Sequence, residues 1–397
     1  MKLAKRVRVI EPSKTLELMA KAKALKAEGK NVLEFQVGEP DFNTPENVKE
    51  AAIKAIRDNF THYTPSPGVM ELRKAICEKL QRDNNLVYTP EEVMVSNGAK
   101  QCLFNAFLAL VDEGDEVIVP APYWVTYPEA VKIAGGTPVF LETTSESDFK
   151  VTPEQLEQAI TDKTKALILC SPSNPTGSVY TEEELRGIAE VVKKHQIFVF
   201  ADEIYEKLVY DGLKFVSFAS LDEEVKKLTI TFNGVSKAYA MTGWRIGYVA
   251  AEKEIIKAMN SLQSHATSNP NSIAQMATIE ALTGPQDELE EMRREFDERR
   301  KYIVKALNEI PGITCREPKG AFYVFPDISS FIGKTFKGQK IENDDTFAKL
   351  LLDNYYVVAV PGSSFGAPGF LRFSYATSLE NIKNGMELLK EFTSKIE

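Results

Sequence analysis

Two basic residues eight positions apart, Lys237 and Arg245, are the side chains of this sequence best suited to carry chemistry. They lie in the segment from Ser236 to Tyr248, which follows an apolar run at 228–232 that predicts a buried strand. Ligands gather at strand ends in open α/β folds. A lysine there can form an imine with an aldehyde, and an arginine can clamp a phosphate, so the pair suggests pyridoxal phosphate. A surface lysine beside a structural arginine remains the alternative for this segment alone.

The apolar run from Phe198 to Ala201 ends in an acidic residue, Asp202. A carboxylate at the end of so apolar a strand is costly to bury unless it has a partner. The ring nitrogen of a pyridine cofactor would be such a partner, because a carboxylate beside it keeps it protonated and makes the ring an effective electron sink. Tyr205, three residues further on, can donate to the ring oxygen. Asp202 and Tyr205 are therefore candidate cofactor contacts.

Two further strand ends carry turn and helix-start signals. At residues 93–101 an apolar strand turns at Gly98 into a helix that we expect to reach about Val111. The free N–H groups and the dipole of a helix start form an anion site, although a plain strand-to-helix turn explains the same pattern equally well. At residues 171–177, after the strand 166–170, the tetrapeptide Asn-Pro-Thr-Gly by itself predicts only a turn.

Taken together, these motifs resemble the cofactor-binding segments of fold-type I pyridoxal-phosphate enzymes, most closely the aspartate aminotransferase group of class I and II aminotransferases. The segment 236–248 is similar to the region of the family's cofactor lysine, and the other motifs occur in the family's order. The likeness runs from about Pro12 to about Leu389, nearly the whole chain. It implies the family's fold and its cofactor, pyridoxal 5'-phosphate.

The resemblance also implies a role for each candidate residue. Lys237 would hold the cofactor covalently, and its freed amine would remove the Cα proton of the amino acid and return it to the cofactor. The implied catalytic residues are Lys237, Asp202 and Tyr205. The implied cofactor contacts are Tyr63, Gly98, Ala99, Lys100, Trp124, Asn174, Asp202, Tyr205, Lys237 and Arg245. The implied substrate contacts are Gly38, Trp124, Asn174, Arg372, Lys100 and Thr15.

Three of these implied roles go beyond what the residues themselves indicate. The phenol of Tyr63 would cross to the phosphate of the neighbouring subunit, which makes the active sites depend on a homodimer. Trp124 would stack on the pyridine ring. Arg372 is the one arginine of the otherwise apolar stretch 370–375. Alone, it is more typical of a structural ion pair, but the family's arginine binds the α-carboxylate as a bidentate fork, with Gly38 close by.

The implied reaction is the ping-pong transfer of an amino group from L-aspartate or L-glutamate to 2-oxoglutarate or oxaloacetate. One subgroup of the family reads the distal carboxylate with a lysine, which corresponds to Lys100, and Thr15 or Ser13 would assist. Aromatic, alanine-type and prephenate aminotransferases on the same catalytic core are the alternatives, although Glu11 stands where relatives that accept prephenate tend to be basic. From another class, Gly362–Gly366 matches the nucleophile elbow of serine hydrolases, but no histidine follows it.

Composition narrows the remaining classes of protein. With 397 residues, 43% hydrophobic and 26% charged, the chain reads as an ordinary globular protein large enough for two domains. Its net charge of -9 disfavours nucleic-acid binding. Four widely spaced cysteines and three scattered histidines predict no metal site. A basic start without a following apolar stretch, and no apolar run near the ~18 residues of a membrane span, predict a cytoplasmic protein.

The order of apolar and amphipathic stretches predicts the architecture. Strand-like runs occur at 93–95, 116–119, 137–141, 165–170, 197–201 and 228–232, with amphipathic helical stretches between most of them. This rhythm predicts an α/β fold with a mainly parallel sheet covered by helices, seven-stranded by resemblance, and a smaller α+β domain. A charged helix over 286–310 should connect the two. The expected boundaries are 1–46 for an N-terminal arm and part of the small domain, 47–290 for the large cofactor domain and 291–397 for the small domain.

Overall fold

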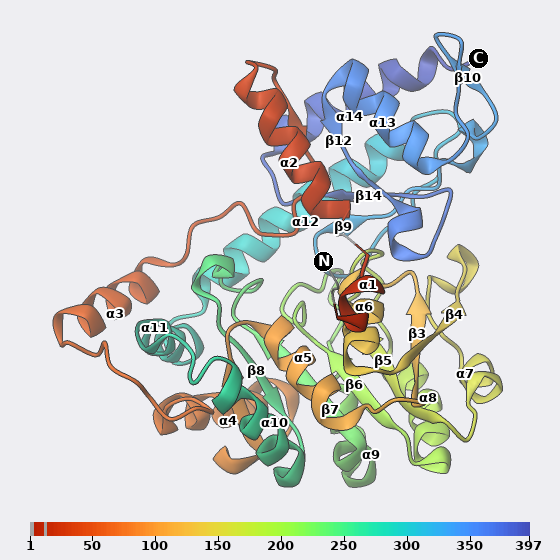
Figure 1. The fold of residues 1–397 in the computed structure, drawn as a ribbon. Helices are drawn as coiled ribbons and strands as arrows, with labels where there is room; N and C mark the ends of the chain where they lie inside the picture. The colour runs from red at the N-terminus through yellow and green to blue at the C-terminus, as the bar shows by residue number, and fades with distance from the viewer. Residues whose placement is uncertain (1–3, 12–13) are drawn as a thin grey trace.

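A seven-stranded sheet forms the centre of the structure, a computed structural model that describes residues 4–11 and 14–397 (Figure 1). In spatial order its strands are β2 (Val93–Ser96), β8 (Gly247–Ala250), β7 (Thr229–Gly234), β6 (Phe198–Asp202), β5 (Thr164–Cys170), β3 (Glu116–Ala121) and β4 (Thr137–Glu142). Strand β8 is antiparallel to both of its neighbours, and the other pairs are parallel. The sheet is mainly parallel, which confirms the predicted fold class.

Helices cover both faces of this sheet. Phe200 and Ile168 belong to the face that packs on α5 (Ala99–Leu110), α6 (Thr126–Ala134) and α10 (Lys253–Ala266). Val199 and Leu167 belong to the opposite face, under α7 (Pro153–Ala159), α8 (Glu182–His195) and α9 (Glu223–Leu228). Consecutive strand residues point to opposite faces, so burial of both faces explains why these strands are apolar without alternation.

A further cluster of buried side chains extends the core past the β2 edge. It joins α3 (Glu46–Arg57), α4 (Met70–Asn84) and α11 (Ser272–Thr283) to β2 and β8. In Figure 1, α3 and α11 lie to the left of the sheet. No helix in the described part of the chain is both long and apolar enough to cross a bilayer.

A second core lies above the sheet in Figure 1 and is built from both ends of the chain. Its helices are α12 (Asp287–Asn308), α13 (Asp344–Tyr355) and α14 (Leu379–Ser394), and α2 (Lys14–Ala27) packs beside them in a small cluster with Val32, Leu352 and Val358. Helix α1 (Lys5–Arg8) lies instead beside α6, which packs on the central sheet. The short strands of the second core are β1 (Leu33–Glu34), β9 (Tyr323–Val324), β10 (Thr335–Phe336), β11 (Gln339–Lys340), β12 (Val357–Val358), β13 (Val360–Pro361) and β14 (Leu371–Ser374). They pair as β13-β14-β9, β1-β12 and β10-β11.

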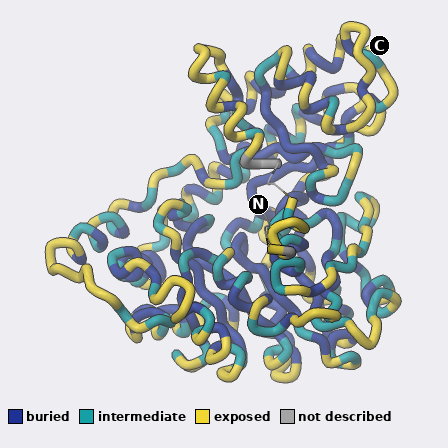
Figure 2. Tube along the Cα trace, viewed as in Figure 1, coloured by how far each residue is buried: buried dark blue, intermediate teal, exposed yellow. Residues whose placement is uncertain are grey.

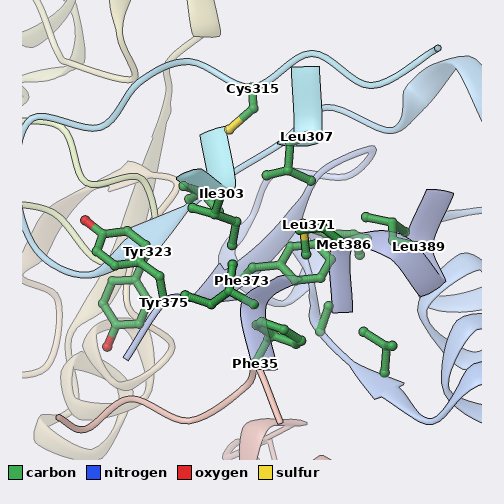
Figure 3. Close-up of a cluster of buried hydrophobic side chains, with 14 of the residues drawn as sticks. Phe35, Ile303, Leu307, Cys315, Tyr323, Leu371, Phe373, Tyr375, Met386 and Leu389 are labelled. Carbon is green, nitrogen blue, oxygen red and sulfur yellow. The ribbon is translucent and has the colours of Figure 1, made fainter. Parts of the chain in front are cut away.

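Figure 3 shows how the two ends of the chain meet in this second core. Phe35, which follows β1, packs edge-on against Phe373 of β14, with ring centroids 5.6 Å apart. Ile303 of α12 and Leu389 of α14 belong to the same buried cluster. Figure 2 shows buried residues concentrated both here and in the central sheet. The predicted domain boundaries at 46/47 and 290/291 remain predictions.

Each of the strands expected from an apolar run is present, with ends that differ by a few residues. The helix expected over 286–310 is α12, Asp287–Asn308. Strand β8 was not predicted, because it has only four residues and begins with a glycine.

Glu203 directly follows β6 and is buried on the face opposite Asp202. Its Oε1 accepts hydrogen bonds from the Ser217 hydroxyl at 2.8 Å and from the Phe218 N–H at 3.1 Å. Its Oε2 is buried without a hydrogen-bond partner among the described residues. Burial, together with the nearby Glu206 carboxylate, raises the pKa of Glu203 to about 8. The folded protein therefore holds this side chain neutral at pH 7.

The Glu203→Gln variant should remove a pH dependence of stability. Between about pH 4.5 and 8 the folded chain keeps a proton on Glu203 that the unfolded chain has lost. The stabilising contribution of that proton is full below pH 4.5 and is lost as the pH rises through 8. We expect the wild type to lose up to about 1.4 kcal/mol per pH unit relative to the variant across this window. Urea unfolding of both proteins at several pH values measures this difference in the free energy of unfolding. If the two free energies change with pH in parallel, Glu203 does not have the raised pKa.

Candidate active site

One cavity of about 870 Å³ lies where the carboxyl ends of β5 and β6 and the loop after β7 meet. This is the edge at which open α/β sheets bind ligands. The predicted residues that line it are Gly38, Ala99, Lys100, Trp124, Asn174, Asp202, Tyr205, Lys237, Arg245 and Arg372. The structure thus brings most of the predicted site residues together from both parts of the fold. Their roles remain predictions.

Lys237 lies in the loop after β7, and its partly buried side chain lines the cavity. Its Nζ donates to the carbonyl oxygen of Gly38 at 2.5 Å. Burial lowers the pKa of Lys237 to about 8, and the Arg245 and Arg372 guanidinium groups act in the same direction. A sizeable fraction of the amine is therefore unprotonated near neutral pH, which a nucleophile or a general base requires.

Asp202 closes β6 and is buried beneath the cavity. Its Oδ2 accepts a hydrogen bond from the Tyr127 hydroxyl at 2.7 Å, and its Oδ1 accepts one from the Ile204 N–H at 3.3 Å. Burial raises the pKa of Asp202, while the hydrogen bond from Tyr127 opposes that rise. The Tyr127 ring also packs edge-on against Trp124, with ring centroids 5.4 Å apart. Tyr127 thus contacts two predicted cofactor residues at once.

The start of α5 has the features of an anion site. Gly98 precedes the helix with φ of 89°, and no side chain caps the helix start. The Arg245 guanidinium approaches so closely that a Cβ on Gly98 would lie 2.5 Å from its Nη2. Arg245 itself has a left-handed backbone, φ 57°, and its Nη1 donates to the Thr242 carbonyl at 2.8 Å. The free helix N–H groups and this guanidinium would both stabilise a bound phosphate.

Gly247 lets β8 pass directly beneath this helix start. A Cβ at Gly247 would lie 2.0 Å from the backbone nitrogen of Ala99, and backbone cannot move aside as a side-chain tip can. We expect Gly247→Ala to cost about 3 kcal/mol of unfolding free energy through overpacking. The matched control is Gly243→Ala, since nothing lies within 4 Å of a Cβ there. Equal urea midpoints for the two variants would contradict the close approach.

Arg372 marks the opposite end of the cavity, and its guanidinium is buried. Its Nη1 donates to Oδ1 of Asn174 at 2.9 Å, and its Nη2 donates to the carbonyl oxygen of Gln36 at 2.7 Å. Its Nε is buried without a partner among the described residues. The guanidinium carbon lies 4.6 Å from the ring centroid of Tyr323. Burial lowers the pKa of Arg372. A buried cation without an acidic partner suits a carboxylate ligand.

Tyr205 reaches the cavity from the segment after β6, but its hydroxyl bonds to another tyrosine. The hydroxyl groups of Tyr205 and Tyr323 are 2.9 Å apart, and burial raises the pKa of both. Tyr323 also lies close to Gly38, where a Cβ would be 3.1 Å from its hydroxyl oxygen. Tyr323 belongs to β9 in the second core, so this hydroxyl pair joins the two parts of the fold at the site.

Lys100 lies in the first turn of α5. Of the three residues predicted to contact the distal carboxylate, it is the one whose side chain the structure describes. Its Nζ lies 4.7 Å from the ring centroid of Trp124, within the cavity. Burial, and then the positive charge of Arg245, lower the pKa of Lys100. The side chain of Thr15 lies outside what the structure describes, and Ser13 is outside the described residues altogether. The substrate contacts predicted for Thr15 and Ser13 remain predictions.

Tyr63 does not line the cavity. Its side chain is 91% exposed on the loop between α3 and α4. The segment Gly362–Gly366, which resembled a nucleophile elbow, contributes Ser363 and Ser364 to the cavity wall, and Ser363 Oγ donates to Asp345 Oδ2 at 3.2 Å. No histidine is among the residues that line the cavity, so a serine-hydrolase site has no base there.

Several residues that line the cavity were not predicted from the sequence, among them Tyr127, Ser236 and Tyr323. Tyr127 and Tyr323 are buried aromatic residues in regular elements, where the usual expectation is a core side chain. Ser236 stands directly before Lys237, inside the segment that was singled out, and this adjacency was the only available signal.

Comparison with known proteins agrees with this geometry. Residues 30–389 match the family model described as aminotransferase class I and II. The chain is 51% identical over 395 residues to the aspartate aminotransferase of Bacillus subtilis (strain 168), with 100% of both chains covered. It is 50% identical to the aspartate/prephenate aminotransferase of Cereibacter sphaeroides, with 96% of both covered. The crystal structure of the aspartate aminotransferase from Rhizobium meliloti superposes with a TM-score of 0.97 at 46% identity and 100% coverage of both chains.

The family model matches most of the chain, residues 30–389. The two curated relatives are 51% and 50% identical to it over nearly their whole length. The motif order, the mainly parallel sheet and the lysine, aspartate and arginine around one cavity agree with this match. The resemblance seen in the sequence is thereby confirmed. This chain belongs to the class I and II aminotransferase family.

Proposed function

We propose that this protein is a pyridoxal-phosphate-dependent aspartate aminotransferase. It transfers the amino group of L-aspartate or L-glutamate to 2-oxoglutarate or oxaloacetate in a ping-pong cycle. The observation that carries the proposal is the convergence of Lys237, Asp202 and Arg372 on a single cavity. Asp202 and Arg372 are buried, Lys237 is partly buried, and none of the three side chains has an ion-pair partner within 4 Å among the described residues. The names of the relatives from Bacillus subtilis and Rhizobium meliloti support the substrate class.

The cavity fits pyridoxal phosphate in three independent respects. The absence of a Cβ on Gly98 lets the Arg245 guanidinium lie against the uncapped start of α5, and this cradle suits the phosphate. The Lys237 amine, with its pKa lowered to about 8, suits attachment to the aldehyde. The Asp202 carboxylate, held by the Tyr127 hydroxyl, suits a protonated ring nitrogen. When bound, the cofactor supplies an electron sink for the Cα–H bond of the substrate.

The chain's own residues would then orient the substrate and move its proton. Arg372 and Asn174 hold the α-carboxylate, which fixes the Cα–H bond relative to Lys237. The unprotonated amine of Lys237 takes the Cα proton and later returns it, as a general acid-base. Trp124 covers one face of the ring. Lys100, inside the same cavity, attracts the distal carboxylate that distinguishes aspartate and glutamate from alanine.

Prephenate is the second candidate substrate, because one relative is named an aspartate/prephenate aminotransferase. Glu11 and Glu129 both line the cavity, and the Glu11 N–H donates to Oε2 of Glu129 at 3.0 Å. Their carboxylates disfavour a further substrate carboxylate at that end of the cavity. Aspartate and glutamate are therefore the preferred substrates. A higher kcat/KM with prephenate than with aspartate would make prephenate the preferred substrate instead.

The proposal includes a cytoplasmic homodimer in which each active site receives a residue from its partner. An almost fully exposed tyrosine, Tyr63, supports it, because large apolar rings left in solvent are typical of surfaces that meet a partner. The phenol would donate to the phosphate bound in the other subunit. Light scattering of the purified protein tests the dimer, and a monomer that turns over at the full rate would exclude the shared site.

An absorption spectrum tests the proposed function directly. The protein loaded with pyridoxal phosphate should show the visible band of a lysine-bound cofactor. That band should convert to the band of the amino form when L-aspartate is added without an oxo acid, and should return on adding 2-oxoglutarate. A band that ignores aspartate but responds to phenylalanine or alanine would move the substrate assignment. No band after soaking would overturn the assignment of Lys237.

Lys100→Ala should change substrate preference rather than abolish turnover. Loss of a charged contact to the distal carboxylate should lower kcat/KM for aspartate about 10- to 100-fold. The value for alanine, which has no distal carboxylate, should stay within about threefold of the wild type. Steady-state kinetics with both donors measures the ratio. Equal losses for both donors would instead assign Lys100 to the cofactor cradle alone.

A further inference from the structure

The loop that carries Tyr63, residues 60–69, combines an exposed tip with a firmly held backbone. The Tyr63 side chain is 91% exposed, yet the loop is tied down on both sides of it. The carbonyl oxygen of Phe60 accepts from the Ser272 hydroxyl at 2.9 Å, and that of Pro67 accepts from the Val95 N–H at 3.0 Å. Most of the remaining anchors come from two buried glutamines, one on α10 and one on α11.

The first of these glutamines, Gln275 of α11, is fully buried and bonds only to backbone and loop atoms. Its Oε1 accepts from the Val69 N–H at 2.8 Å. Its Nε2 donates to the Thr64 hydroxyl at 3.0 Å and to the Pro270 carbonyl oxygen at 2.9 Å. Thr64 is the residue next to Tyr63. Gln275 therefore holds the loop both beside the tyrosine and at the start of α4.

The second glutamine, Gln263 of α10, is also fully buried and uses its whole amide. Its Nε2 donates to the carbonyl oxygens of Ser66 and Val95, both at 2.8 Å. Its Oε1 accepts from the Ser96 hydroxyl at 2.5 Å and from the Asn105 amide at 3.1 Å. Ser96 ends the strand that leads into the start of α5, and Asn105 lies within α5. Gln263 thus joins the loop to the element that carries the proposed phosphate cradle.

We infer that Gln263 and Gln275 are positioning residues for Tyr63, which they hold ready to bind the phosphate in the partner subunit. The inference rests on the proposed function, because it assumes the homodimer and the phosphate contact. Neither glutamine lines the cavity, so neither can act on the cofactor directly. Both act through the loop.

The physical reason is the entropy of ordering. A tyrosine on a loose loop loses backbone and side-chain freedom when it binds, and that loss is subtracted from the strength of the contact. A loop that is already fixed loses only the freedom of one side chain. Gln263 has a second role, because its side-chain amide supports two elements. One is the proposed phosphate cradle of its own subunit, and the other is the Tyr63 loop that would reach the partner subunit. The two phosphate sites of the dimer are then connected through one side chain.

The test compares the binding of pyridoxal phosphate with that of pyridoxal, which lacks the phosphate. Apoenzyme variants are titrated with each aldehyde, and dissociation constants are taken from the absorption band. Tyr63→Phe should weaken pyridoxal phosphate about tenfold and leave pyridoxal unchanged, because hydrogen bonds to charged groups are strong. Gln275→Met should weaken pyridoxal phosphate about fivefold, again with no effect on pyridoxal.

A double-mutant cycle separates positioning from general damage. Gln275→Met added to Tyr63→Phe should cause no further loss of affinity for pyridoxal phosphate, because the hydroxyl that Gln275 positions has already been removed. Gln263→Met should remain partly additive, since it also supports Ser96. The matched control is Thr278→Val, which removes a buried hydrogen bond from the Thr278 hydroxyl to the Ala274 carbonyl within α11 and touches no loop atom. It should leave both dissociation constants unchanged.

The outcomes distinguish the inference from the proposed function. If Tyr63→Phe leaves the affinity for pyridoxal phosphate unchanged, the phosphate contact proposed for the dimer is wrong. If Tyr63→Phe weakens binding, but Gln275→Met either has no effect, adds fully to it or weakens pyridoxal equally, the positioning role is wrong and the dimer contact stands. Should Gln275→Met fail to fold, Gln275→Glu keeps the acceptor for Val69 and removes the donors, and the same cycle applies.

Discussion

Replacing Lys237 with alanine is expected to lower kcat/KM about 10⁴-fold or more, the largest effect of any single substitution in this chain. Proton transfer by a positioned base alone contributes up to about 10⁴-fold. In the proposed function Lys237 would also hold the cofactor covalently, and its amine lies in the cavity with its pKa lowered to about 8. The measurement is steady-state transamination between aspartate and 2-oxoglutarate, with circular dichroism to show that the variant is folded.

The matched control for Lys237→Ala is Lys100→Ala, which removes a second lysine from the same cavity. With alanine as the donor for both variants, Lys100→Ala should keep its activity and Lys237→Ala should not, so general loss of positive charge is not the cause. In the wild type, the rate of covalent cofactor attachment should rise with pH through about 8 and then level off, because the unprotonated amine of Lys237 is the nucleophile. A Lys237→Ala enzyme that retains a tenth of wild-type turnover would contradict the assignment.

The parallel part of the fold was predictable because its strands are buried on both faces. The run Ala166–Leu169 is continuously apolar for that reason, and it is β5 in the structure. Strand β8 shows the limit of this reasoning. It has four residues and starts with Gly247, and its identity as a strand depends on pairing with β2 and β7 from distant parts of the chain. No local pattern records that pairing.

The site divides in the same way between local and distant signals. Asp202 and Arg372 were visible because a charged residue in an apolar strand is unusual, wherever its partner lies. Tyr127 and Tyr323 were not visible, since an aromatic residue in a buried element is ordinary. The Tyr127 hydroxyl bonds to Asp202, 75 residues away in sequence, and the Tyr323 hydroxyl bonds to Tyr205, 118 residues away. Only folding shows that one tyrosine supports the aspartate and the other joins Tyr205 to the arginine.

Asp202→Asn is expected to lower kcat about 10³-fold, the second largest effect. Asparagine keeps the shape of the side chain, and its carbonyl oxygen can still accept from the Tyr127 hydroxyl now 2.7 Å from Oδ2. What it removes is a buried negative charge that the proposed ring nitrogen needs to stay protonated, together with the second acceptor oxygen, which now accepts from the Ile204 N–H at 3.3 Å. Removing one preorganised electrostatic contact of this kind costs about 10²- to 10³-fold. Pre-steady-state mixing with aspartate measures the half reaction directly.

Tyr127→Phe is the control that separates the effect of the Asp202 charge from the effect of the hydrogen bond that the Tyr127 hydroxyl donates to it. It leaves the carboxylate in place and removes one hydrogen bond, which should raise the pKa of Asp202, because that bond opposes the effect of burial. A bound cationic ring acts against this rise, so the loss in kcat should stay below about tenfold. Equal losses in the two variants would show that geometry, and not charge, is what Asp202 contributes. Near-full activity of Asp202→Asn would show that the ring nitrogen does not lie beside this carboxylate, and the proposed orientation of the cofactor would have to be abandoned.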